Sequence, residues 1–131
     1  MGSSAAADVP GPDAAFSLDD ADGGVLLLTW APGVTITADL AAAAMARVNG
    51  HNEDRVRPLL VDMTGIAALS RDAHRYFKQR SRISRIAIVG ESAVDRVIAN
   101  FGLRVSPPPV PSRFFNSKDA ALVWLQQTAA P

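Results

Sequence analysis

The alternation of short apolar runs with helix-like segments constrains this fold more than any other feature. Leu59-Leu60-Val61 ends at Asp62, and Arg85–Val89 ends at Gly90. Both runs are too short for helices, so each is read as a strand buried within a parallel sheet. Strands that alternate with helices imply right-handed crossovers and helices packed on the sheet. We therefore expect an α/β fold with a mixed, mostly parallel sheet.

The remaining elements complete a regular order. A hairpin is predicted from Phe16–Leu18 and Val25–Trp30, around a polar turn at residues 19–24. Four helices are expected: Ala38–Val48 after the N-cap Thr37 and closing near Asn49-Gly50, Ser70 to about Arg80, Ser92 to Gly102, and Lys118–Gln127 after Ser117. Arg113–Phe115 is the last strand, after the extended, proline-rich stretch Val105–Pro111. The order is β-β-α-β-α-β-α-β-α, with about five strands.

Side-chain spacing assigns faces to three of these helices. Val94, Val97, Ile98 and Phe101 form the cleanest i, i+3, i+4, i+7 stripe in the chain, after an approximate capping box from Ser92 to Asp95. In the helix from Ser70, Ala73 and Phe77 share one face, while Arg71, Arg75 and Lys78 are expected in solvent. The last helix is expected to turn Ala121, Trp124 and Leu125 inward.

The chain is expected to form one domain. Its 131 residues are 48% hydrophobic and 20% charged, which is typical of globular proteins. Residues 1–15 have no hydrophobic period and are expected to be a flexible tail, residues 16–127 the domain, and residues 128–131 a C-terminal tail. No signal peptide or transmembrane segment is apparent, so we expect a cytoplasmic protein.

Charge is distributed unevenly along a chain of zero net charge. Residues 1–54 hold eight acidic and one basic side chain (−7), and residues 55–131 hold five acidic and twelve basic (+7). Zero net charge argues against general nucleic-acid binding. The two halves either neutralise each other within one domain or pair between copies, and on the second reading we expect a homodimer.

No catalytic or cofactor motif is apparent. The chain has no cysteine, and its two histidines, His51 and His74, lie outside any nucleophile or metal-ligand motif. Both are expected at the solvated surface. Because no phosphate-binding loop or dinucleotide fingerprint is present either, we expect a non-enzymatic protein with no cofactor and no metal.

Asp62 permits one further reading. A carboxylate at the end of a buried strand is typical of phosphoacceptor domains, which gather further acidic residues for Mg²⁺. Asp19, Asp20 and Asp22 follow the first strand and could supply such a cluster. Turn formation and capping explain these aspartates equally simply.

Three segments carry a resemblance to a known family. They are Leu59–Gly65, Arg85–Gly90, and Arg113–Phe115 with Ala120–Leu125. The chain resembles the STAS-like superfamily from about Phe16 to Leu125. More closely, it is similar to small bacterial proteins grouped with sporulation anti-sigma factor antagonists and with lipid-binding CRAL-TRIO domains. The shared motifs are mostly structural, so the resemblance implies a fold rather than an activity.

In the anti-sigma antagonists, the resemblance implies an Asp-Ser pair whose serine is phosphorylated at a helix N-terminus. Here Ser70 aligns with that aspartate and Arg71 with that serine, so the switch residue is missing. Ser70 substitutes for it only with a one-residue offset, and a role as N-cap also accounts for Ser70.

Two functional classes remain open. In the first, the domain binds a protein partner through a face whose residues are Asp62, Met63, Thr64, Ser70, Arg71 and Arg75. In that face, the Met63–Leu69 loop is expected to expose apolar side chains beside the arginines. In the second, the domain binds lipid or a small apolar ligand through the basic run Arg71, Arg75, Lys78, Arg80, Arg82 and Arg85.

Overall fold

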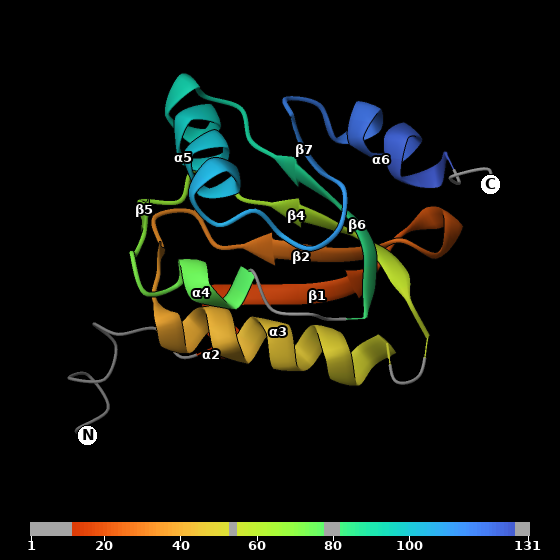
Figure 1. Cartoon of the computed structure of the whole chain (residues 1–131), viewed down its shortest axis with the longest axis horizontal. Coiled ribbons are helices and arrows are strands. Elements are labelled where there is room, and N and C mark those ends of the chain that lie inside the picture. The colour runs from red at the N-terminus through yellow and green to blue at the C-terminus, as the bar shows by residue number, and fades with distance from the viewer. Residues whose placement is uncertain (1–11, 53–54, 78–81, 128–131) are drawn as a thin grey trace.

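A five-stranded sheet forms the centre of the protein (Figure 1). The computed structural model describes residues 12–52, 55–77 and 82–127. The strands are β1 (Phe16–Asp20), β2 (Leu26–Trp30), β4 (Arg57–Asp62), β6 (Ile83–Val89) and β7 (Ser112–Phe115), in the order β1-β2-β4-β6-β7. β1 pairs with β2 in antiparallel fashion, and the other pairs are parallel. The predicted hairpin and mostly parallel α/β sheet are therefore confirmed.

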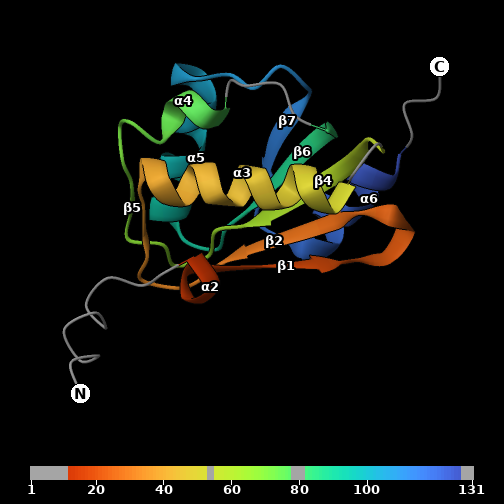
Figure 2. The ribbon, with the colours of Figure 1, turned by 90° about the horizontal axis from the view of Figure 1, so that it is seen from below.

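Helices cover both faces of this sheet. α3 (Ala38–Asn52) and α5 (Ala93–Val105) pack on the face formed by alternate residues such as Leu28 and Leu59. α6 (Lys118–Gln126) packs on the opposite face, against Leu60 and Ala87. The short helix α4 (His74–Phe77) packs against α3, and its His74 ring contacts Phe101 of α5. In the view of Figure 1 it lies between the two helices, and Figure 2 shows it to one side of α3. Apolar residues on both faces of β4 and β6 thus produce two cores.

Small elements extend the architecture beyond the predicted order. They are the helical turns α2 (Pro12–Ala15) and η1 (Asp22–Gly24) and a two-stranded parallel sheet of β3 (Thr35–Ile36) and β5 (Ala68–Leu69). Ala15, in the expected N-terminal tail, is fully buried and belongs to α2. Residues 1–11 and 128–131, the rest of the two predicted tails, lie outside the described residues.

Two helices continue past glycines at which they were predicted to end. α3 runs through Gly50 to Asn52, whose buried side-chain amide donates to the Arg82 carbonyl at 2.6 Å. α5 runs through Gly102 to Val105. A Cβ on Gly102 would lie 3.3 Å from Cε1 of His74, so this glycine permits the close approach of α4 to α5. Tertiary contacts therefore override the local tendency of glycine to end a helix.

The helix predicted from Ser70 to about Arg80 is much shorter among the described residues. Ser70 Oγ does accept a hydrogen bond from the Ala73 amide at 3.3 Å, but regular helix covers only His74–Phe77. Residues 78–81 lie outside the described part of the chain. A helix of four residues has little macrodipole, so its N-terminus has little attraction for an anion.

Side-chain capping at three other helices follows the prediction. Ser92 and Asp95 form a reciprocal capping box at α5, and Ser117 Oγ accepts from the Ala120 amide at α6. At α3, Thr37 Oγ1 accepts from the Leu40 amide at 3.3 Å. These caps depend on residues close in sequence, which is why the pattern identified them.

Candidate functional site

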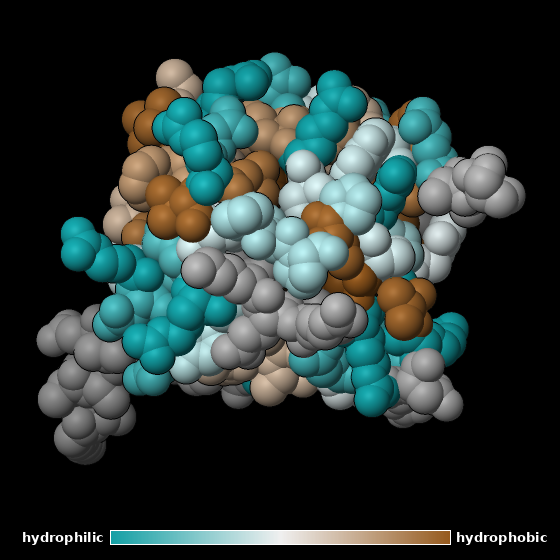
Figure 3. Space-filling view, in the orientation of Figure 1, coloured by the Kyte–Doolittle hydropathy of each residue, from teal (hydrophilic) through white to brown (hydrophobic). Residues whose placement is uncertain are grey.

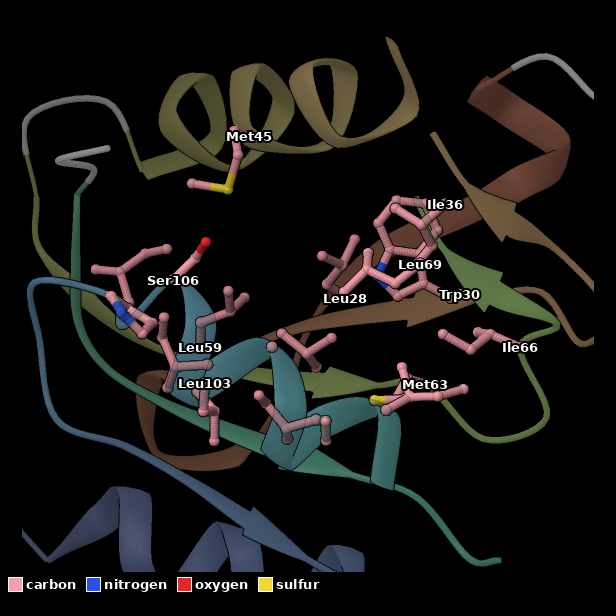
Figure 4. A pocket seen from close by; sticks show the side chains of 18 of the residues that line it. Leu28, Trp30, Ile36, Met45, Leu59, Met63, Ile66, Leu69, Leu103 and Ser106 are labelled. Carbon is pink, nitrogen blue, oxygen red and sulfur yellow. The ribbon is translucent and has the colours of Figure 1, made fainter. Parts of the chain in front are cut away.

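An apolar cavity lies between the sheet and the helices α3 and α5. Its volume is about 110 Å³. Figure 4 shows side chains from both layers pointing into it, with Met45 on α3 opposite the end of α5. It is lined by Leu28, Trp30, Ile36, Met45, Leu59, Val61, Met63, Ile66, Leu69, Ile83, Ile86, Ile88, Ile98, Ala99, Gly102, Leu103, Ser106, Pro108, Pro109 and Val110. Ser106 supplies the one side-chain hydroxyl in this lining, so the cavity suits an apolar occupant.

A groove adjoins the cavity on the outer side. This α4/α5 groove has a volume of about 540 Å³ and is lined by Leu69, Arg71, Asp72, His74, Arg75, Phe101, Val105 and Ser106. Leu69 and Ser106 line both spaces, so they mark the junction between an apolar interior and a polar, partly charged exterior.

His74 lies at this junction and is buried, which overturns the prediction that it is solvated. Only 8% of its surface is exposed, and its ring packs edge-on against the Phe101 ring, with the ring centroids 6.1 Å apart. Burial lowers its pKa below the ordinary value of 6.5, so the ring is neutral at pH 7. Nδ1 is buried without a hydrogen-bond partner. The packing of α4 against α3 and α5, which local sequence does not encode, causes this burial.

The apolar stripe of α5 faces outward. Val94, Val97, Phe101 and Val105 are 62%, 66%, 52% and 50% exposed, and we call these four residues the α5 stripe. Figure 3 shows hydrophobic side chains gathered over the surface that α5 occupies. The buried residues of α5 are instead Asp95 and Ala99. Amphipathic helices usually turn such a stripe toward the core, so its exposure marks a candidate contact surface.

The structure divides the predicted interaction face into three places. Asp62 and Thr64 form one of them: Asp62 Oδ1 accepts from the Thr64 hydroxyl at 2.7 Å and from its amide at 3.1 Å. Lys118 Nζ lies 3.4 Å from Asp62 Oδ2. This lysine follows β7. It is far from Asp62 in the sequence, so the sequence pattern did not predict their contact.

The other members of the predicted face lie on opposite sides of the 63–70 loop. Met63 is buried in the cavity, as is Ile66, so the expectation that this loop exposes apolar side chains is wrong. The loop closes over the core because its apolar residues face α5 and the sheet. Ser70 is half-buried, whereas Arg71 and Arg75 are exposed and line the α4/α5 groove.

The acidic cluster considered around Asp62 does not form. β1 runs antiparallel to β4, so Asp20 lies at the opposite end of the sheet, opposite Leu26. There the Arg57 guanidinium donates to Asp20 Oδ1 at 2.7 Å, and His51 Nε2 lies 3.2 Å from the same oxygen. The hydrogen bond from Arg57, then that from His51, lowers the pKa of Asp20.

The basic run considered for lipid binding is likewise divided. Arg85 packs over the Trp124 ring at 4.3 Å and donates to the Trp124 carbonyl, on the α6 face of the sheet. Arg71 and Arg75 lie at the groove instead. Lys78 and Arg80 fall outside the described residues. A strand alternates its side chains between faces, which separates Arg85 from the arginines near α4.

The described residues form neither a metal-binding cluster nor a membrane-spanning helix. Within residues 12–52, 55–77 and 82–127, no group of three or more histidine, cysteine or acidic side chains is placed to hold a metal ion. No helix in the same ranges is long and apolar enough to cross a membrane.

Sequence reasoning missed the cavity and the wall that α5 gives to the groove. The sequence does place Phe101 and Val105 one turn apart, next to Gly102. That spacing indicates an apolar ridge beside a point of close helix approach, but not the direction in which the ridge faces. Arg71 and Arg75 are the groove residues that the sequence did reveal, through their four-residue spacing.

Comparison with solved structures identifies the fold. A protein described as an uncharacterized protein from the DUF3478 family with a SpoIIAA-like fold, from Shewanella loihica PV-4, has a TM-score of 0.57 and 19% identity, covering 85% of this chain and 92% of that one. An anti-sigma factor antagonist from Mycobacterium paratuberculosis has a TM-score of 0.57 and 18% identity, with the same two coverages, 85% and 92%. Both support the predicted STAS-like fold.

Sequence comparison identifies the family. A protein with unknown function from Arthrobacter sp. FB24 is 43% identical over 86% of this chain and 100% of that one, with a TM-score of 0.34. None of the curated proteins matches the chain. The family described as Domain of unknown function (DUF7793) matches residues 19–129. The chain therefore belongs to this family, on a STAS-like fold.

Proposed function

We propose that this domain is a cytoplasmic, non-enzymatic regulatory module that binds a protein partner through the α5 stripe and the adjoining α4/α5 groove. The observation that carries the proposal is the exposure of four large apolar side chains along one helix face. An anti-sigma factor antagonist shares the fold, and a regulatory protein partner is consistent with that neighbour.

The spacing of the stripe suits a partner helix. Val94, Val97 and Phe101 follow each other at intervals of three and four residues, which is the spacing of a helix–helix seam. Val105 extends the seam to the groove, where Phe101 also forms part of the wall. A helix laid along α5 would bury these side chains and reach the groove at its end.

The charges around the seam favour an acidic partner. Arg71 and Arg75 line the groove, and Arg104 is exposed on α5, whereas Asp72 is the acidic side chain of the groove lining. Within the described ranges, Arg71 and Arg75 form no ion pair. A second copy of the chain would present the same basic flank to itself, which complementarity disfavours. We therefore commit to a partner helix with apolar side chains on one face and acidic residues beside them.

Site-specific photo-crosslinking tests this proposal. A photoreactive phenylalanine analogue at Val97 is expected to capture a partner in cells, and the crosslinked peptide should be an acidic, amphipathic helix. The matched control is the same analogue at Val123, a 59% exposed valine on α6. Sequencing of the crosslinked peptide shows whether the captured segment has an apolar face with acidic residues beside it, which capture of a protein alone would not show.

Two outcomes would overturn the proposal. Equal crosslinking from positions 97 and 123 would mean that the α5 stripe has no special affinity. Crosslinking from position 97 to a second copy of this chain would assign the stripe to self-association instead. An acidic helix captured from position 97 and not from 123 supports the proposal.

A further inference from the structure

We propose that the apolar cavity and the α4/α5 groove together form a binding site for a small monocarboxylate with a short apolar body. The body would occupy the cavity, and the carboxylate would lie in the groove. This ligand site shares the groove, with Arg71 and Arg75, with the partner surface proposed above, and it gives the apolar-ligand alternative a specific location and chemistry.

The cavity determines the apolar part of the ligand. A cavity of about 150 Å³ is known to accept benzene. The cavity here, at about 110 Å³, accommodates a smaller body of about four or five carbons by the same measure. Its walls are aliphatic, aromatic or methionine side chains, with Ser106 at the end near Met45 (Figure 4). A polar body would lose hydrogen bonds on entering this space.

The junction supplies an unsatisfied polar atom. His74 is more than nine-tenths buried, and its Nδ1 has no hydrogen-bond partner. A Cβ built on Gly102, a residue that lines the cavity, would lie 3.7 Å from this nitrogen. His74 also lines the groove, so Nδ1 lies where the two spaces meet. A ligand oxygen at the junction could accept a hydrogen bond from the Nδ1 tautomer, removing the cost of an unpaired buried group.

The groove determines the charge of the ligand. Its charged side chains are Arg71, Arg75 and Asp72, so the arginines outnumber the carboxylate while His74 is neutral. A guanidinium binds a carboxylate through two parallel hydrogen bonds, which makes a planar carboxylate the best-matched anion. Leu69 and Ser106 line the passage from groove to cavity, so one or two further carbons would span it.

Methionine methyl NMR provides the test. The chain has three methionines, and Met45 and Met63 line the cavity. Titration of the full chain with butanoate, hexanoate and dodecanoate should shift the Met45 and Met63 methyl signals. Each added methylene that enters the cavity should strengthen binding roughly fourfold, so hexanoate should bind roughly fifteenfold more tightly than butanoate. Dodecanoate should give no further gain, because its chain exceeds the cavity.

Variants separate the two halves of the site. Arg71→Gln with Arg75→Gln should weaken hexanoate at least about tenfold and leave hexanol binding unchanged, because the alcohol carries no charge. Arg104→Gln, an exposed α5 arginine outside both spaces, is the matched control and should change neither ligand. Ala99→Leu, which fills part of the cavity, should weaken both hexanoate and hexanol. If this variant fails to fold, the methyl shifts of the unmodified chain still report on the cavity.

The following results would overturn the proposal. Met45 and Met63 signals that remain unmoved by hexanoate up to about 10 mM would show that the cavity takes no such ligand. Hexanol binding as tightly as hexanoate to the unmodified chain, or an arginine double variant that binds hexanoate normally, would exclude a carboxylate in the groove.

Discussion

Replacement of Asp95 by alanine should destabilise the fold more than the same replacement of an exposed charged residue. Asp95 is only 2% exposed, and its carboxylate accepts from the amides of Glu91 at 3.0 Å, Ser92 at 3.3 Å and Gly65 at 3.4 Å. The carboxylate thus joins the 63–70 loop to the start of α5. A hydrogen bond to a charged group contributes about 1.5–3 kcal/mol, and a helix cap about 1 kcal/mol. Because the Gly65 contacts are long, we expect a loss of about 3 kcal/mol in the free energy of unfolding.

Urea denaturation followed by circular dichroism measures this loss. In thermal unfolding followed by the same signal, the melting temperature of the variant should be lower by about 10 °C for a chain of this size. Asp119→Ala is the control, since Asp119 is an exposed acid in the first turn of α6, where the dipole effect is about 0.5 kcal/mol. Equal losses in the two variants would refute the reasoning, because the buried network at Asp95 would then contribute nothing beyond a favourable helix dipole.

The pH dependence of the same site gives an independent check. Burial alone would raise the pKa of Asp95, but the hydrogen bonds from the Glu91, Ser92 and Gly65 amides outweigh it, so the pKa lies below the ordinary 3.8. The stabilisation is therefore complete above 3.8 and is lost as the pH falls through the folded pKa. Asp95→Asn should be less stable than the unmodified chain at pH 7, and the difference should shrink in acid. A constant difference down to pH of about 2 would contradict the assignment.

Three further predictions follow from other features. Arg57 is buried and donates to Asp20 and to the Gly24 carbonyl, so Arg57→Leu should lower the free energy of unfolding by about 2–3 kcal/mol in urea denaturation, against little change for Arg104→Leu. Because burial lowers the pKa of His74, the unfolded chain takes up a proton that the folded protein does not, and stability should fall as the pH drops below 6.5; His74→Leu should flatten this slope. The −7 and +7 halves predict a homodimer that weakens with salt, and sedimentation equilibrium showing a monomer at low and high salt would exclude it.

Local chemistry made much of this fold predictable. Asp62 and Gly90 end the two central strands as expected, and Ser92 and Ser117 cap the helices that they precede. Each of these features depends on residues within a few positions of one another. Turn, cap and strand preferences act over that range, so pattern alone identified the element order and the parallel sheet.

Long-range packing determined the rest. The same amphipathic pattern that predicted α5 did not reveal that Val97 and Phe101 face outward, because hydrophobic spacing defines a face without naming what covers it. His74 is buried, and Gly102 remains inside a helix, because α4 and α5 approach closely in space. The sequence by itself determined the elements and their order. The tertiary structure decided which apolar surfaces became core, cavity or exposed stripe, since that depends on contacts between segments far apart along the chain.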